Sequence, residues 1–268
     1  MQLSEELFLQ EYDPSQFERP SVTVDILVMT VLERKLHLLL VRRSELPFLG
    51  KWALPGGFLK MDESAEEAAT RIVLAKAGVS GAHLEQLYTF SSVERDPRTR
   101  VLSIAYLATV PYGKLKFAAG DSVDNASLYT VDGISGDGID TGSEDAFASD
   151  ESELVLTSPD GNEITGRDLA FDHEMIIRTA VLRMRGKIGY TDIAFRFLAD
   201  MDSFSLSELQ TVFEAVLGRK LDNSNFRRFI RNRYEETGRM VLTDREDKQG
   251  RGRPAALYQL KETGVKQR

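Results

Sequence analysis

The sequence predicts two domains: an α/β domain in which helices flank a mixed sheet, followed by a mainly helical domain that ends in a β-hairpin. The chain has 268 residues, 42% of them apolar, which is enough material for two hydrophobic cores. Strand-like and helix-like patterns alternate over residues 22–172, whereas helical patterns dominate residues 173–268. We therefore expect a boundary between residues 172 and 173, and residues 1–21 are expected to form an N-terminal arm.

The two regions differ in charge. The formal net charge is −8, yet residues 167–268 hold 20 Lys and Arg against 15 Asp and Glu, and residues 1–166 hold 14 against 27. This asymmetry is typical of an acidic domain joined to one that meets phosphate groups, although ordinary compositional scatter would also produce it.

Composition also excludes several kinds of chemistry. The absence of Cys excludes disulfides, Cys-bound zinc and a thiol nucleophile. No stretch approaches the roughly 20 apolar residues that span a bilayer, and the first residues lack a basic flank followed by an apolar segment. We therefore expect a soluble cytoplasmic protein with no membrane partner.

The first elements are an arm and a pair of strands. Residues 1–20 carry scattered Leu, Phe and Tyr, and they predict a short helix or arm packed on the body. Residues 21–33 and 35–43 are rich in β-branched and apolar side chains, with a turn-like Glu33-Arg34 between them. This pattern indicates two paired strands.

A helix with recognisable ends follows a loop rich in Gly and Pro. Ser64 is placed to cap its N-terminus, and Glu67 completes a capping box. Gly78 stands where a left-handed residue ends a helix. The spacing therefore predicts a helix over residues 65–77.

Two strands and a long polar segment come next. Residues 83–93 and 101–112 alternate as strands do, whereas Gly, Ser, Asp and Thr dominate an insertion at 119–166. Within the insertion only residues 153–164 indicate a hairpin. A calcium site at 133–145 is one interpretation, but a solvated acidic loop is favoured because the spacing does not match an EF-hand.

The remaining chain is helical until its last strands. Helical patterns cover residues 172–188, 190–201, 205–218 and 223–238. Ser205 or Ser207 can cap the third helix, and Asp222 or Asn223 the fourth. Residues 239–262 predict two short apolar strands around a basic tip that contains Gly and Pro.

The segment from Gly57 to Val79 resembles the Nudix box. Its Gly57, Glu63, Arg71 and Gly78 fit the family pattern Gly-x5-Glu-x7-Arg-Glu-U-x-Glu-Glu-x-Gly-U, in which U is aliphatic. The LPGGF loop and the RDPR turn are similar to the branch of the family that handles ADP-ribose. The resemblance covers roughly the first 172 residues, except the N-terminal arm and most of the insertion. It implies an α/β Nudix fold, a mixed sheet with flanking helices.

The residues that would bind metal in an active Nudix enzyme are missing. In such enzymes a glutamate pair near the end of the helix binds Mg²⁺, which neutralises a diphosphate and helps generate hydroxide. The three later glutamate positions are occupied here by Ile72, Ala75 and Lys76. Lys76 places a positive charge where the cation would lie. We therefore expect no catalytic residue, no metal ligand and no required cofactor.

Three carboxylates remain that could support hydrolysis. If the domain is active, Glu63, Glu66 and Glu67 would be the catalytic and metal-binding residues, with Mg²⁺ or Mn²⁺ as the cofactor. The favoured interpretation is structural, because carboxylates in a first helical turn complete caps and interact with the helix dipole. Arg71 is expected to pair with Glu63 or Glu67.

The last hundred residues resemble a winged helix-turn-helix domain. Phe226, Phe229 and Ile230 form an apolar stripe along the predicted second helix of the motif, so its other faces carry the basic side chains. The tip at 247–254 resembles a wing. The candidate DNA-binding residues are Arg227, Arg228, Arg231, Asn232, Lys248, Arg251 and Arg253. A solvated helix face is the alternative explanation for any one of these arginines.

Together the two resemblances are to the NrtR-type Nudix-related transcriptional regulators. They imply a homodimer that binds palindromic double-stranded DNA and responds to a small-molecule effector. The implied effector is ADP-ribose or a related nucleotide or sugar metabolite, and the implied targets are genes of NAD metabolism. The candidate ligand-binding residues are Arg42, Arg43, Trp52, Glu63 and Arg98, although Trp52 would equally suit the core.

Two other functions stay open, and one element is assigned a role in signalling. The first alternative is a metal-dependent Nudix hydrolase of ADP-ribose or another nucleoside diphosphate derivative. In the second, the C-terminal half is a dimerisation or protein-interaction module. For the regulator, we expect the linking helix at residues 172–186 to transmit the ligand's preference to the DNA-binding domain.

Overall fold

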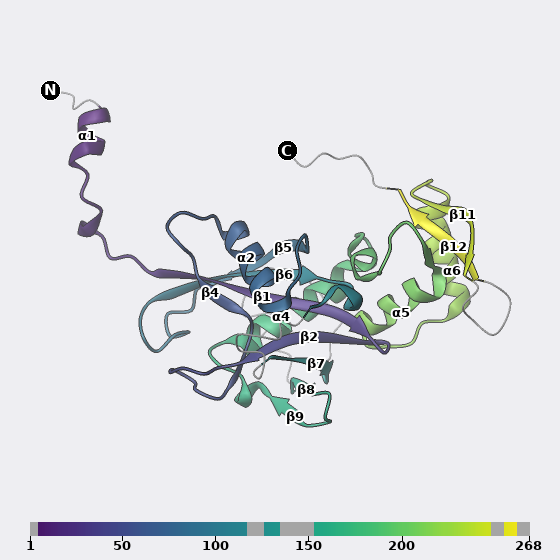
Figure 1. The fold of residues 1–268 in the computed structure, drawn as a ribbon, viewed down its shortest axis with the longest axis horizontal. Coiled ribbons are helices and arrows are strands. Elements are labelled where there is room, and N and C mark those ends of the chain that lie inside the picture. Colours follow the sequence, from purple (N-terminus) through teal and green to yellow (C-terminus); the bar gives the residue numbers. More distant parts are fainter. Residues whose placement is uncertain (1–4, 117–125, 135–152, 248–254, 262–268) are drawn as a thin grey trace.

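The computed structural model describes residues 5–116, 126–134, 153–247 and 255–261, and within them a mixed sheet forms the centre of the first domain (Figure 1). The strand order is β5-β6-β1-β2-β7-β8-β9, with β3 paired to β2 and β4 paired to β1. Its strands are β1 (Ser21–Leu32), β2 (Lys35–Arg42), β3 (Trp52–Ala53), β4 (Gly56–Phe58), β5 (His83–Phe90), β6 (Val101–Thr109), β7 (Ala126–Asp132), β8 (Val155–Thr157) and β9 (Glu163–Thr165).

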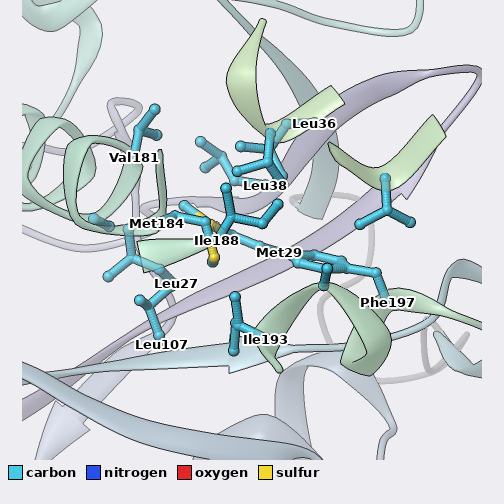
Figure 2. Packing of buried hydrophobic residues seen from close by; sticks show 14 of the residues in the cluster. Leu27, Met29, Leu36, Leu38, Leu107, Val181, Met184, Ile188, Ile193 and Phe197 are labelled. Atoms are coloured by element: carbon cyan, nitrogen blue, oxygen red, sulfur yellow. The ribbon is translucent and has the colours of Figure 1, made fainter. Parts of the chain in front are cut away.

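The central strand β1 is covered on both faces. Every residue from Val24 to Thr30 is buried, and because side chains alternate along a strand, both faces must meet other elements. Helix α2 (Ala65–Ala77) packs on one face against Val24, Ile26 and Val28. Helix α4 (His173–Lys187) packs on the other, where its Val181 and Met184 lie near Leu27 and Met29 (Figure 2).

The two strongest local predictions are confirmed. Helix α2 spans the predicted residues 65–77, with the capping box between Ser64 and Glu67, and Gly78 adopts a left-handed conformation with φ of 66°. A Cβ on Gly78 would also lie 2.1 Å from the Lys116 carbonyl oxygen, so a larger residue would clash. Strands β1 and β2 pair as predicted, and the pairing is antiparallel.

The turn between β1 and β2 has an unusual backbone. Glu33 and Arg34 have φ values of 48° and 65°, although neither is Gly. Positive φ at both central residues matches the right-handed twist of a two-residue hairpin. The turn therefore projects the Arg34 side chain from the end of a stiff hairpin.

The C-terminal part combines helices with a second sheet. After α4 come η5 (Ile193–Phe197), β10 (Phe204–Ser205), α5 (Leu206–Leu217), α6 (Asn223–Ile230) and η6 (Arg231–Glu235), and then β11 (Met240–Asp247) and β12 (Ala255–Leu260). The strand order is β10-β12-β11. Ser205 caps α5 through a capping box with Glu208, and Asp222 caps α6. These caps decide between the alternatives that the sequence left open.

Three expectations were wrong. The helix expected at 190–201 is only a short 3-10 turn, because Ile193, Ala194, Phe195 and Phe197 are all buried and leave no polar face for a longer surface helix. The insertion expected at 119–166 includes β7, which pairs with β2 as a strand of the main sheet. Only Leu128 and Tyr129 of β7 are buried, so its hydrophobic alternation is weak.

The third wrong expectation concerns the N-terminal arm. Helix α1 (Glu5–Glu11) does form, but all residues from 5 to 20 are exposed, and the arm projects away from the sheet (Figure 1). None of the helices in the described ranges combines the length and the hydropathy that a membrane-spanning segment requires.

One further expectation is confirmed, and two others are not tested by the described residues. The hairpin expected at 153–164 is formed by β8 and β9. Most of the segment weighed as a calcium site, residues 135–145, lies outside the described residues. The boundary between residues 172 and 173 stays a prediction, because α4 contacts both the sheet and α5.

Candidate functional site

A cavity of about 630 Å³ opens beside the Nudix-like helix α2. Its walls come from the end of β2 and the following loop, from β4, from the end of α2, from the turn after β5 and from the segment before α4. The charged residues that line it are Arg42, Arg43, Lys76, Arg95 and Arg98, together with Asp25, Glu45 and Asp96. Cations outnumber carboxylates, so the cavity favours an anionic ligand.

A buried ion network forms the floor of the cavity. Arg95 donates two hydrogen bonds to Asp172, from Nε to Oδ2 at 2.9 Å and from Nη2 to Oδ1 at 2.7 Å. The same Nη2 lies 3.6 Å from Asp25 Oδ2, and the Ser103 hydroxyl also donates to that oxygen. Such bidentate pairs fix orientation as well as charge. A Cβ on Gly56 would lie 2.1 Å from Asp25 Oδ1, so the floor requires glycine there.

His173 completes the floor as a neutral side chain. The Leu54 backbone N–H donates to His173 Nδ1 at 2.9 Å, so the ring proton is assigned to Nε2, which lies 3.9 Å from Asp25 Oδ1. Burial lowers the pKa of His173 from its ordinary value, because the charged form would lose its hydration. His173 therefore ties β3 and the following segment to the start of α4.

Aromatic rings and guanidinium groups alternate on the cavity wall. The Arg43 guanidinium lies 4.9 Å from the centre of the Phe171 ring, and that of Arg98 lies 5.6 Å from Phe58 and 5.8 Å from Phe171. Arg98 also donates to both oxygens of Asp96, at 3.0 and 2.7 Å, and this pairing raises the pKa of Arg98. Flat cations and rings arranged in this way suit a ligand with a planar base and phosphate groups.

The structure brings together some of the candidate ligand-binding residues. Arg42, Arg43 and Arg98 line the cavity, whereas Trp52 and Glu63 lie outside its lining. Trp52 is half-buried and its ring packs edge-on against Tyr129, with centres 5.1 Å apart. The floor residues Asp25, Arg95 and His173 were missed by the sequence analysis. Of these, Arg95 stands in the RDPR turn, which could have indicated it.

Two of the carboxylates that precede or begin α2, Glu63 and Glu67, are held by hydrogen bonds within the chain. Arg71 donates to both oxygens of Glu63, at 2.9 and 2.5 Å, and the Lys60 N–H donates to the same carboxylate. The hydrogen bond from Arg71 is the main cause that lowers the pKa of Glu63 to about 2. Glu67 holds the capping box with Ser64. This pairing of Arg71 with Glu63 agrees with the expectation.

The residues of the box do not fit Mg²⁺. Ile72 is buried in the core, and Ala75 and Lys76, which line the cavity, supply no carboxylate oxygen. Among the described residues, no group of three Asp, Glu or His side chains is placed to hold a metal ion. Glu66 is exposed on the first turn of α2 and belongs to no such group.

A second candidate surface lies on α6 and η6. Phe226 and Ile230 are buried, and the Phe213 ring of α5 packs 5.3 Å from Phe226 and 5.8 Å from Phe229. This packing leaves the opposite side of the helix in solvent. The exposed candidates there are Arg227, Arg228, Arg231 and Asn232. Lys248, Arg251 and Arg253, the candidates at the wing tip, lie outside the described residues.

Comparison with known proteins agrees with this architecture. Residues 21–147 match the NUDIX domain family, and residues 195–260 match the NrtR DNA-binding winged helix domain family. A protein of Acinetobacter baylyi named ADPR responsive transcriptional repressor NtrR is 31% identical over 96% of this chain and 88% of its own length. The chain belongs to the NrtR family. The predicted fold class, a Nudix domain followed by a winged-helix domain, is confirmed.

Two further relatives of this NrtR-family chain are informative. The structure of Shewanella oneidensis NrtR complexed with a 27mer DNA is 30% identical and has a TM-score of 0.66, covering 90% of this chain and 93% of that one. An ADP-ribose pyrophosphatase of Methanocaldococcus jannaschii is 36% identical over 115 residues, which are 43% of this chain and 64% of that protein. The first relative matches both domains, and the second is similar over less than half of this chain.

Proposed function

We propose that this protein is a transcriptional repressor whose Nudix domain binds ADP-ribose and whose winged helix binds operator DNA. The observation that carries the proposal is the conjunction of two features in one chain. A cavity lined by arginines and aromatic rings lies beside a Nudix helix that lacks its metal-binding glutamates, and exposed arginines lie on the second helix of the helix-turn-helix. The similarity to a repressor named as ADP-ribose responsive supports the choice of effector.

The chemistry of the cavity suits ADP-ribose. Its volume of about 630 Å³ lies within the range of ordinary small-molecule sites. Arg42, Arg43 and Arg98 would bind the diphosphate, and the rings of Phe58 and Phe171 would stack on the adenine. The Nudix domain then acts as a sensor that requires no cofactor.

The exposed face of α6 suits a DNA backbone and major groove. Arg227, Arg228 and Arg231 supply cations for phosphates or guanine edges, and Asn232 supplies an amide. A two-fold dimer would place two such helices on a palindromic operator. The three arginines of this surface contribute to the basic balance of residues 167–268.

Helix α4 is the proposed route between the two sites. It begins at His173 on the cavity floor and ends near Lys187, which forms an ion pair with Glu85 of β5. Near its C-terminal end, Arg185 donates to the Val216 carbonyl at 3.2 Å, which connects α4 directly to α5. A ligand that prefers one position of α4 would therefore change the affinity for DNA.

Gel-shift titrations test this function. The chain is titrated against its own upstream DNA at low and moderate salt, with ADP-ribose, with AMP as a control, and without nucleotide. We expect ADP-ribose to change the apparent Kd, and Arg98→Ala to reduce that response about tenfold while DNA binding without ligand is unchanged. Arg167→Ala, an exposed arginine that neither lines the cavity nor lies on α6, is the control. Equal affinities with and without ADP-ribose at matched salt would refute the proposal.

A second candidate function is ADP-ribose hydrolysis. It is favoured by the similarity to an ADP-ribose pyrophosphatase and would use Glu63, Glu66 and Glu67 with Mg²⁺ or Mn²⁺. We expect no product above background when ADP-ribose is incubated with either metal. Robust turnover that Glu67→Ala abolishes would establish the hydrolase instead.

A further inference from the structure

Helix α4 differs from α2, α5 and α6 at its N-terminus. Ser64, Ser205 and Asp222 begin the other three helices, and each side chain accepts a hydrogen bond from the backbone N–H three residues ahead, at 2.8 Å for Asp222. Asp172 stands at the N-cap of α4, yet its side chain makes no such hydrogen bond. Asp is among the most favourable N-cap residues, so a preferred contact is left unmade.

The first turn of α4 retains open hydrogen-bond donors. The N–H groups of His173 and Ile176 donate to carbonyl oxygens just before the helix, each at 3.2 Å. Between them, the N–H groups of Glu174 and Met175 donate to no acceptor within the part of the chain that the structure describes. These are the second and third residues of the helix, whose donors an N-cap side chain normally satisfies.

Arg95 holds the carboxylate of Asp172 instead. From the turn after β5, Arg95 donates to both oxygens of that carboxylate, at 2.9 and 2.7 Å. The Arg95 side chain is 3% exposed, and the residue lines the cavity proposed for ADP-ribose. Its remaining guanidinium nitrogen, Nη1, makes no hydrogen bond to any described residue. One guanidinium group therefore contacts the start of α4 and belongs to the wall of the cavity.

The backbone just before α4 is strained. Phe171, which lines the cavity and lies beside the guanidinium groups of Arg43 and Arg98, has φ of 52° although its side chain is large. Asp172 has ψ of 22°, whereas the N-cap residues of α2, α5 and α6 are extended, with ψ of 165°, 156° and 127°. Capping by Asp172 therefore requires a rotation about its ψ, and that rotation moves the start of α4.

We propose that Arg95 is a ligand-binding residue and that Asp172 is the positioning residue that couples the cavity to α4. A phosphate group of the ligand takes the Arg95 guanidinium from Asp172, and the freed carboxylate rotates to accept from the Met175 N–H. Asp25, whose Oδ2 lies 3.6 Å from Arg95 Nη2, remains beside the guanidinium. The rotation shifts the start of a helix whose other end is hydrogen-bonded to α5. This role rests on the proposed binding of ADP-ribose.

Two substitutions of Asp172 separate capping from pairing. Asp172→Asn keeps an oxygen that can cap α4 but has no charge to hold Arg95, so without ligand its affinity for operator DNA should equal that of the natural chain saturated with ADP-ribose. Asp172→Ala can neither cap nor pair, so its affinity should stay near the ligand-free value. Calorimetry should show that both variants still bind ADP-ribose. Asp160→Asn, the same chemical change at an exposed residue outside the cavity lining, is the control. Equal DNA affinities of the Asn and Ala variants would overturn the proposal.

Amide hydrogen exchange gives a second measurement that needs neither DNA nor ADP-ribose. In Asp172→Asn the new cap should slow exchange of the Glu174 and Met175 N–H groups about fivefold relative to the natural chain, the factor that one N-cap typically contributes. Exchange in the first turn of α5, which Ser205 already caps, should be unchanged. Equal exchange in Asp172→Asn and the natural chain would contradict the proposed role of Asp172. Failure of the proposed function would appear instead as no binding of ADP-ribose to the natural chain.

Discussion

Arg34, in the turn between β1 and β2, donates a hydrogen bond to Glu214 of α5 across 2.6 Å, and so joins the Nudix hairpin to the first helix of the helix-turn-helix. Glu214 is buried and also accepts from Lys220 at 3.0 Å and from the Leu221 N–H at 3.1 Å. The carboxylate thus holds together the hairpin tip, the helix and the turn that leads to α6. Glu214 is therefore one of the contacts that orient the DNA-binding helices, together with the Arg185–Val216 hydrogen bond and the shared hydrophobic cluster.

Glu214→Gln should lower the free energy of unfolding, and the size of the loss should depend on pH. Burial acts to raise the pKa of Glu214, but the donors from Leu221, Lys220, Arg34 and Gln210 outweigh it and lower the pKa from 4.5 to about 2. A lowered pKa means that the stabilisation is complete above pH 4.5 and is lost as the pH falls toward 2. Thermal unfolding should show that loss in the natural chain and a flatter profile in Glu214→Gln, with about 1–3 kcal/mol lost at neutral pH.

The Arg34 partner supplies the control for that experiment. Its side chain is 53% exposed, so Arg34→Ala should cost less than about 1 kcal/mol by itself. In the double variant with Glu214→Gln, the cost of Arg34→Ala should shrink, because the neutral amide keeps an acceptor oxygen but carries no charge to pair with Arg34. Parallel pH profiles for the natural chain and Glu214→Gln would show that the carboxylate is not the titrating group.

Arg227→Ala and Arg231→Ala should change how DNA binding responds to salt. Each arginine is exposed on the face opposite the buried Phe226 and Ile230. If each contacts one phosphate, its removal should reduce the slope of log K against log salt by about 0.9. Titration of operator DNA over a series of salt concentrations measures the slope. Arg167→Ala should leave it unchanged, and an unchanged slope in all three variants would remove α6 from the interface.

Two carboxylates should restore a metal site. Ala75 and Lys76 are exposed and line the cavity, so Ala75→Glu with Lys76→Glu places two acidic side chains beside it without disturbing the core. We expect calorimetry to detect Mn²⁺ binding in this variant and none in the natural chain. Leu74→Glu with Lys76→Glu makes the same change in charge, but Leu74 is not part of the lining, so it should bind more weakly. Equal Mn²⁺ binding by the natural chain would count against the loss of the site.

Gly56→Ala should destabilise the floor of the cavity. The added methyl carbon would lie 2.1 Å from Asp25 Oδ1 and 3.2 Å from the Val24 carbonyl oxygen, so the buried carboxylate must move. We expect a loss of about 1–3 kcal/mol, measured by urea unfolding. Gly113→Ala meets nothing within 4 Å and is the matched control. Equal stabilities of the two variants would mean that the floor adapts without cost.

Local signals in the sequence predicted helix α2 and its caps, because Ser64, Glu67 and Gly78 act on neighbouring backbone groups. The same holds for α5 and for the β8–β9 hairpin. Strand β7 was missed because its place is decided by pairing with β2, nearly ninety residues away in the chain. Short apolar segments of this kind form strands because the fold places a partner strand beside them.

Only part of the cavity could likewise be predicted from the sequence. Arg42, Arg43 and Arg98 could be predicted from the family resemblance, and all three line it. The RDPR turn could have indicated Arg95, but its pairing with Asp172 spans 77 positions and follows no local pattern, so this partner could not be predicted. Buried ion networks depend on which strands and loops the fold brings together.

A single hydrophobic cluster runs from Leu27 of the sheet through Met184 of α4 to Phe213 of α5 and Leu260 of β12. The Nudix domain and the winged-helix domain therefore share one hydrophobic core, to which both contribute side chains. We therefore expect the Nudix domain and the winged-helix domain to unfold in one cooperative thermal transition. If the winged-helix domain were replaced by that of a relative, the chain would fold only if the inward face of α4 were replaced with it. The two domains are therefore constrained to evolve together.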